Sequence, residues 1–280
     1  MSDQHTLGAT VELAGIGLHT GAAARVRLRP QRAGSGMRFQ LVDPNVTFPA
    51  LAEYIVDTRR ATVVGSGGAT VSTVEHLLSA LFALGVDNAS IEVEGPEIPV
   101  LDGSSAAFVR AIEQAGLVAQ HVPRRTLVVD RPLIFRDGDA LLAIAPADTF
   151  RIRFAVDFAP PVGAQYIDAT VEPDFYAREI APARTFGYLH EVEALRSAGL
   201  ARGGSLDNAL VFAPEGPLSP LRWQNEVVRH KVLDLIGDFA LLGAWPRCDI
   251  VSIKSGHRLH AQATHALRVA FVPHLAALGS

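Results

Sequence analysis

Cysteine is almost absent from this sequence, which contains a single one, Cys248, in 280 residues. This scarcity excludes a disulfide framework and a cysteine-rich metal site, so any metal site must use histidine, aspartate or glutamate. An excess of basic residues is also lacking, because the net charge is −4, and we therefore expect no nucleic-acid partner. Neither a Walker motif nor a G-x-G-x-x-G pattern occurs, which argues against a kinase or a dehydrogenase.

The sequence also lacks a hydrophobic run long enough to cross a membrane. The most apolar helical run, residues 77–86, covers about ten residues, whereas a membrane-spanning helix needs about twenty. Residues 1–4 are polar and lack the basic segment that opens a signal peptide. We therefore expect a soluble, cytoplasmic protein without stable membrane insertion, whose contact with a membrane surface is at most transient.

Lysine is nearly missing, although basic residues are not. Of the 25 Lys and Arg residues only two are lysines, Lys231 and Lys254, and the other 23 are arginines. The general preference for arginine has no obvious functional meaning. The two exceptions suggest that a compact ammonium group is needed at one or both positions.

Hydrophobic residues make up 49% of the chain, which is typical of a packed globular protein, and 280 residues suit one large or two ordinary domains. Each half combines strand-like segments with about two helices, which predicts an α+β fold of two similar domains, each with helices packed on a sheet. Residues 120–125 are the expected linker. Strands are expected within residues 6–41, 91–93, 127–129, 141–144 and 152–156, and helices at residues 72–84, 105–114, 191–197, 225–242 and 265–278.

The segment 225–238 carries the most informative pattern. His230, Asp234 and Asp238 are spaced four residues apart, so they form one polar stripe along a helix. His230 and Asp234 are about 6 Å apart along the helix axis, which allows both side chains to bind one metal ion. An ordinary solvated helix face is the alternative. The apolar stripe of the same helix consists of Val228, Val232, Leu235 and Phe239.

A second pattern, Ser72-Thr73-Val74-Glu75-His76, opens the first long helix and has two interpretations. Ser72 and Glu75 have the spacing of a capping box, in which Glu75 bonds back to the start of the helix. Alternatively, His76 is a third metal ligand and Glu75 is a base beside it, as catalytic zinc sites require. In that case the ligands come from both halves of the chain, and the site lies between the two domains.

A third pattern, residues 254–257, places His257 on a glycine-containing turn after an expected strand at 250–253. A histidine on such a turn can act as a general acid, and Asp238 could hold it protonated. A surface histidine without function is the alternative.

With these patterns in place, the chain resembles the UDP-3-O-acyl-N-acetylglucosamine deacetylases, the zinc enzymes of lipid A and lipopolysaccharide biosynthesis in Gram-negative bacteria. The resemblance runs from about residue 7 to residue 266 and depends on seven motifs in order. These are residues 15–21 (GIGLHTG), 72–81 (STVEHLLSAL), 95–104 (GPEIPVLDGS), 183–187 (ARTFG), 203–208 (GGSLDN), 228–234 (VRHKVLD) and 254–257 (KSGH).

The resemblance implies hydrolysis of the N-acetyl amide of UDP-3-O-acyl-N-acetylglucosamine to the free amine and acetate, the committed step of lipid A biosynthesis. It implies domains at 1–122 and 126–280, with the active site at their interface and an acyl-passage insert at about 186–212. The implied zinc (Zn2+) ligands are His76, His230 and Asp234. The implied catalytic residues are Glu75 as base, His257 as acid oriented by Asp238, and Lys231 and Thr185 at the reacting carbonyl oxygen. The implied lining of the acyl passage consists of Phe186, Leu189, Val192, Ala201, Gly204, Ser205 and Val211.

Two places differ from the pattern of this family. Pro160-Pro161 stands where many members have His-Pro, and Arg258-Leu259-His260 stands where many have a small residue, Leu and Asn. We expect the second difference to alter the product-side rim of the site. Two other functions stay open from the residues alone: a metal amidohydrolase acting on a different acylated amino sugar, and a non-catalytic nucleotide-sugar binding module.

Overall fold

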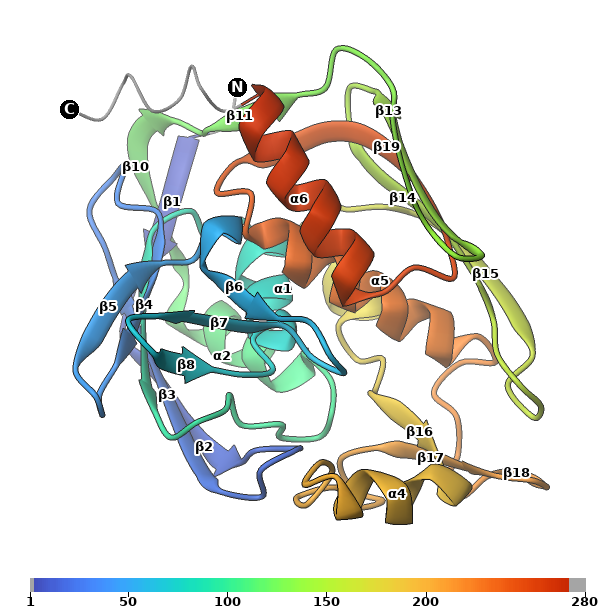
Figure 1. The fold of residues 1–280 in the computed structure, drawn as a ribbon. Helices are drawn as coiled ribbons and strands as arrows, with labels where there is room; N and C mark the ends of the chain where they lie inside the picture. The colour runs from blue at the N-terminus through green and yellow to red at the C-terminus, as the bar shows by residue number, and fades with distance from the viewer. Residues whose placement is uncertain (1–2, 272–280) are drawn as a thin grey trace.

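The computed structural model of residues 3–271 shows two large sheets, one of five strands and one of six (Figure 1). Five strands of each sheet follow one another in the same order. In the first sheet the order is β2 (Val11–Ile16), β3 (Ala23–Pro30), β9 (Ala89–Glu94), β4 (Met37–Leu41) and β5 (Val46–Pro49). In the second it is β12 (Leu133–Asp137), β13 (Ala140–Pro146), β19 (Trp245–Ile253), β14 (Phe150–Asp157) and β15 (Ala164–Thr170), and β11 (Thr126–Val128) pairs with β19 outside this path. Along this order, neighbouring strands are antiparallel except for one parallel pair in each sheet. This pair is β4 with β9 in the first sheet and β14 with β19 in the second. The predicted α+β fold of two similar domains is confirmed.

The strand bounds follow the alternation of apolar and polar residues. In β3, Ala24, Val26 and Leu28 are buried while the arginines between them point outward, as the two-residue period of a strand requires.

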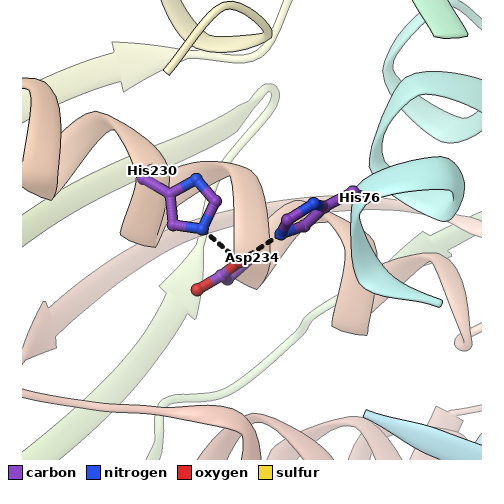
Figure 2. A group of neighbouring side chains, drawn as sticks. All are labelled: His76, His230 and Asp234. Atoms are coloured by element: carbon purple, nitrogen blue, oxygen red, sulfur yellow. Dashed lines mark ion pairs between the residues drawn. The ribbon is translucent and has the colours of Figure 1, made fainter. Parts of the chain in front are cut away.

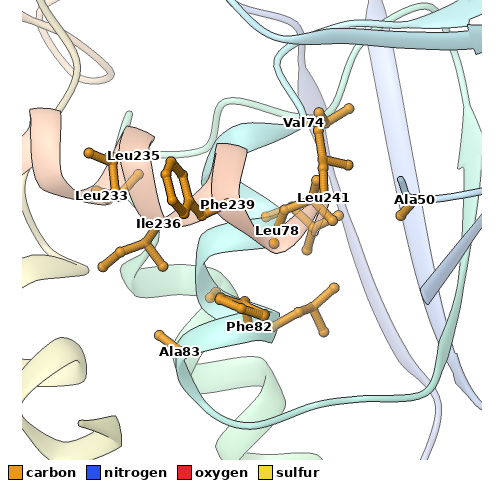
Figure 3. Packing of buried hydrophobic residues seen from close by; sticks show 14 of the residues in the cluster. Ala50, Val74, Leu78, Phe82, Ala83, Leu233, Leu235, Ile236, Phe239 and Leu241 are labelled. Atoms are coloured by element: carbon orange, nitrogen blue, oxygen red, sulfur yellow. The ribbon is translucent and has the colours of Figure 1, made fainter. Parts of the chain in front are cut away.

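The main helices lie between the two sheets (Figure 1). Helices α1 (Glu75–Ala83) and α2 (Ala106–Ala115) belong to the first half, and α5 (Glu226–Ala240) and α6 (His257–Phe271) to the second. Helix α1 packs directly against α5, so the two domains share one core. Figure 3 shows Leu78 and Phe82 of α1 beside Phe239 and Leu241 at the end of α5.

A glycine permits the close approach of α1 and α5. A Cβ atom on Gly237 would lie only 2.1 Å from the backbone oxygen of Glu75, so only glycine fits at this crossing. Asp234 and Asp238, on either side of Gly237, are thereby brought to the first turn of α1. The predicted apolar stripe of α5 is confirmed, since all four of its residues are fully buried.

The smaller elements complete the path of the chain. Strands β16 (Phe186–Tyr188) and β17 (Leu210–Ala213) are parallel and enclose α4 (Val192–Ser197), so the segment 186–212 is a strand-helix-strand unit as predicted. No helix among residues 3–271 is long and apolar enough to cross a membrane. The remaining elements are β1 (Asp3–Leu7), η1 (Ala52–Tyr54), β6 (Ile55–Asp57), β7 (Val63–Ser66), β8 (Ala69–Val71), β10 (Leu117–Pro123), α3 (Pro173–Phe175), η2 (Tyr176–Ile180), η3 (Leu189–Glu191) and β18 (Gly216–Pro217).

Three expectations about secondary structure need correction. Helix α1 begins at Glu75 without a side-chain cap, so the capping box of Ser72 and Glu75 is not formed. The last helix begins at His257 rather than residue 265, and the expected end at residue 278 lies outside the described residues. The expected linker is mostly strand, because β10 extends to Pro123 and pairs with β1. We retain 1–122 and 126–280 as the proposed domains.

Candidate active site

Three side chains that could hold a metal ion meet where α1 crosses α5. The Nε2 atom of His230 lies 3.4 Å from Asp234 Oδ1, and Nε2 of His76 lies 3.7 Å from the same oxygen. All three residues are buried, and Figure 2 shows both rings directed at the carboxylate. The helical spacing of four residues places His230 beside Asp234, and the packing of α1 on α5 adds His76.

The arrangement leaves one strong acceptor without a partner. Asp234 Oδ1 is buried and accepts no hydrogen bond in the part of the chain that the structure describes. A buried carboxylate oxygen without a partner is costly, and a cation would compensate it. His230 Nδ1 lies 3.0 Å from the backbone oxygen of Ala183, which orients the ring and leaves Nε2 free to bind a metal. These residues therefore fit a metal ion.

Glu75 lies at the start of α1, immediately before His76. Its Oε2 atom accepts a hydrogen bond of 3.1 Å from the backbone amide of Thr62, and its Oε1 atom lies 3.7 Å from His257 Nε2. Burial, together with the nearby carboxylates of Asp234 and Asp238, raises the pKa of Glu75 to about 8. Glu75 therefore has one anchored oxygen and one that faces the site.

His257 is held from behind by Asp238. Its Nδ1 atom lies 2.8 Å from Asp238 Oδ2, so Nε2 is the nitrogen that faces Glu75. Although burial lowers the pKa of His257, the contact with Asp238 outweighs it and raises the value to about 9. His257 is the first residue of α6 rather than part of a loop, so its backbone is more constrained than we expected.

The family difference at residue 260 lies inside the protein and not at the rim that we expected. His260 is fully buried, with Nδ1 2.8 Å from Asp238 Oδ2 and Nε2 2.7 Å from Ser255 Oγ. The other oxygen of Asp238 accepts a hydrogen bond of 2.5 Å from Thr62 Oγ1. His260 is thus a further support for Asp238, which sequence reasoning missed because helical burial at this position was not predicted.

The two lysines have different surroundings. The side chain of Lys231 is partly buried, and its Nζ donates a hydrogen bond of 2.7 Å to Asp234 Oδ2. Burial opposes its charge, but the attraction of Asp234 prevails and raises the pKa of Lys231. Lys254 lies at the surface and pairs with Asp139 and Asp157 at 3.1 Å. Of the two lysines, only Lys231 therefore belongs to the site.

A cavity of about 600 Å³ opens beside these groups and extends along the 186–212 insert. Its wall is mostly apolar, and the residues that line it include Thr185, His230, Lys231, Asp234 and His257. Every residue predicted for the acyl passage lies on this wall: Phe186, Leu189, Val192, Ala201, Gly204, Ser205 and Val211.

Sequence reasoning missed several other residues of the wall. Leu195 lies one helical turn after Val192, so the helical period could have identified it. Leu18 and His19 belong to the 15–21 motif, which had no role assigned to it. The further lining residues that were missed include Arg60, Phe158, Arg196, Leu206, Ala209 and Leu218.

Comparison with known proteins gives one family along nearly the whole chain. The family model described as UDP-3-O-acyl N-acetylglycosamine deacetylase matches residues 4–269. A relative from Nostoc sp. is 47% identical over 268 residues, which cover 92% of this chain and 96% of the relative. Relatives from Syntrophotalea carbinolica (45%, covering 92% and 85%) and Citrifermentans bemidjiense (44%, covering 95% and 89%) are similar. All three carry the name UDP-3-O-acyl-N-acetylglucosamine deacetylase.

Proposed function

The chain belongs to the UDP-3-O-acyl N-acetylglycosamine deacetylase family, and on that premise we propose which of its own residues carry out the reaction. It is an enzyme that removes the acetyl group from UDP-3-O-acyl-N-acetylglucosamine in lipid A biosynthesis. The substrate is therefore an acylated amino sugar linked to UDP.

We propose that His76, His230 and Asp234 hold a zinc ion. The unpartnered Oδ1 of Asp234 and the two Nε2 atoms directed at it support this assignment. Two imidazoles and one carboxylate are donors that zinc accepts, and three protein ligands leave a position for water or substrate. When bound, zinc would supply a Lewis acid that activates water, polarises the acetyl carbonyl and favours the ionised form of Glu75.

Glu75 takes the proton from the attacking water in this proposal. Its Oε1 atom is the acceptor, because Oε2 is engaged by the backbone amide of Thr62. The bond to Thr62 also keeps the carboxylate in one orientation, which general base catalysis requires.

His257 delivers a proton from Nε2 to the departing amine. Asp238 holds Nδ1 and stabilises the protonated ring, so the transferable proton is on the nitrogen that faces the site. Lys231 and Thr185 lie on the same cavity wall and are placed to donate hydrogen bonds to the carbonyl oxygen as it gains negative charge.

The acyl chain of the substrate occupies the apolar cavity along the 186–212 insert in this proposal. Burial of a long chain against Leu189, Val192 and Val211 supplies binding energy away from the reacting amide. Such remote binding energy can position the amide against the catalytic groups.

The observation that carries the residue assignment is the approach of His76 Nε2 and His230 Nε2 to the unpartnered Oδ1 of Asp234. Incubation of the purified protein with UDP-3-O-acyl-N-acetylglucosamine tests it, with acetate and free amine measured after chelation and after zinc is restored. We expect activity to be lost with the chelator and to return with zinc. Undiminished turnover by the metal-free protein would refute the metal assignment.

A further inference from the structure

Glu97 is a fully buried carboxylate outside the catalytic group, in the 95–104 motif to which no function was assigned. Its Oε1 atom accepts a hydrogen bond of 2.8 Å from Thr73 Oγ1 and one of 3.0 Å from the backbone amide of His19. Its Oε2 atom accepts bonds from the backbone amide of Thr20 at 2.9 Å and from Thr20 Oγ1 at 2.7 Å. One carboxylate thus joins two segments that are far apart in sequence.

The first segment leads directly into the catalytic helix. Thr73 has a φ of 57°, which a β-branched residue adopts only under strain. Two residues later α1 begins with Glu75 and His76. The backbone amide of Ser72 bonds to Pro96 at 3.0 Å, so the chain before Thr73 is already fixed beside Glu97. The hydroxyl bond to Glu97 therefore holds the strained residue that sets the direction of the first turn of α1.

The second segment forms part of the cavity wall. Leu18 and His19 line the cavity, and their backbone oxygens accept bonds of 3.0 Å and 3.1 Å from the amides of Gly203 and Arg202. The loop is built around the carboxylate, because a Cβ atom on Gly17 would lie 2.2 Å from Glu97 Oε2. Glu97 thereby holds the loop against the insert that encloses the acyl cavity.

We propose that Glu97 is a positioning residue that fixes the catalytic base and the wall of the acyl cavity relative to each other. Through Thr73 it orients Glu75 and His76, and through Thr20 it places Leu18 and His19 against the insert. This inference rests on the proposed function of the site. It expects the contact with Thr73 to affect turnover and the contact with Thr20 to affect binding of the acyl chain.

Glu97→Ala tests the whole connection, with Glu94→Ala as a matched control three residues earlier on the exposed end of β9. We expect Glu97→Ala to lower kcat about 10- to 100-fold, as small misplacements of catalytic groups do, and to raise KM for a long-acyl substrate. Glu94→Ala should keep the parent values. The thermal unfolding of each variant shows whether the fold is intact.

Single hydroxyl variants separate the two connections even if Glu97→Ala fails to fold. Thr73→Val keeps the strained, branched side chain without its anchor, and should lower kcat about tenfold with little change in KM. Thr73→Gly removes the strain and should recover most of that loss. Thr20→Val should raise KM for long-acyl but not short-acyl substrate, whereas Thr20→Ser should stay within about threefold of the parent.

Zinc affinity gives a readout that needs no substrate. Because His76 lies in the turn that Thr73 directs, a competition titration should show weaker zinc binding by Thr73→Val, by about tenfold, and parent affinity for Thr20→Val. Parent kinetics and zinc affinity in both Thr73→Val and Thr20→Val would overturn the inference and leave Glu97 a structural residue. A parent protein that is inactive on the acylated UDP-sugar would instead refute the proposed function.

Discussion

Two neighbouring groups of buried side chains contain the same residue types, yet only one of them suits a metal ion. The first group consists of His76, His230 and Asp234. The second consists of Asp238, His257 and His260. In the first, Asp234 Oδ1 has no hydrogen-bond partner among residues 3–271. In the second, Asp238 Oδ1 accepts from Thr62 and Oδ2 is shared by two imidazoles at 2.8 Å. The difference that favours a metal ion in the first group is therefore a carboxylate oxygen without a hydrogen-bond partner.

The same contrast separates two kinds of chemistry along one helix. Asp234 and Asp238 are one turn apart on α5, and both are held in the ionised form, since nearby cationic groups outweigh burial and lower the pKa of each. Asp234 faces two imidazoles across a gap, whereas Asp238 contacts its imidazoles directly. The first arrangement suits a metal ion and the second suits a held proton.

The largest loss of activity should come from replacing a histidine of the first group, and the matching replacement in the second group is the control. His230→Ala should lose bound zinc and with it all measurable deacetylation, because only two ligands remain. His260→Ala should keep stoichiometric zinc, because its group is already satisfied by hydrogen bonds. Metal analysis of the two purified variants measures this. Full zinc occupancy in His230→Ala would remove His230 from the ligand set.

Replacement of the proposed base should separate metal binding from turnover. Glu75→Ala should retain zinc and lower kcat by about 100- to 10,000-fold, the usual contribution of a general base. Metal content and steady-state rates of the same preparation provide the test. A variant nearly as active as the parent would show that Glu75 only anchors the segment at Thr62.

A smaller loss is expected at Lys231, where shape as well as charge matters. Lys231→Arg should fold and bind zinc but lose about 10- to 1000-fold in kcat, or about 1.4 to 4 kcal/mol, because a wide guanidinium does not fit where the ammonium does. Lys254→Arg is the matched control, since its partners Asp139 and Asp157 lie at the surface. Equal kinetics of the two variants would remove the catalytic role of Lys231.

The titration of His257, which Asp238 supports, should determine the alkaline side of the pH–rate profile. The acid form of His257 is needed, so the rate falls as pH rises through its pKa, which Asp238 raises to about 9 against the effect of burial. Asp238→Asn removes that support and should move the alkaline limb of kcat/KM to lower pH by at least about one unit. An alkaline limb at the parent position would mean that another group controls it.

The smallest effect should come from a substitution in the acyl passage, because it leaves the catalytic residues unchanged. A Cβ atom on Gly204 would lie 3.2 Å from the backbone oxygen of Ala201, so Gly204→Leu narrows the passage. Activity on a long-acyl substrate should fall about tenfold or more, and activity on a short-acyl one should change little. Equal losses on both substrates would place the acyl chain elsewhere.

Much of the site could be predicted because its pattern is local. The four-residue spacing of His230, Asp234 and Asp238 follows from 3.6 residues per turn, whatever the helix packs against. The apolar stripe of α5 and the strand alternation of β3 are local in the same sense. The family motifs added the other implied site residues as an order along the chain, without distances between them. The catalytic roles of these residues stay predictions.

Tertiary structure decided what these patterns could not. Whether Glu75 capped its own helix or faced Asp234 depended on the approach of α1 to α5, which the missing side chain of Gly237 permits. The burial of His260 depended on the docking of α6 beside α5. The sequence by itself determined which side chains share a helix face, because helical geometry is a property of neighbouring residues. Only packing determined which faces meet, because that depends on volumes and contacts between segments far apart in the chain.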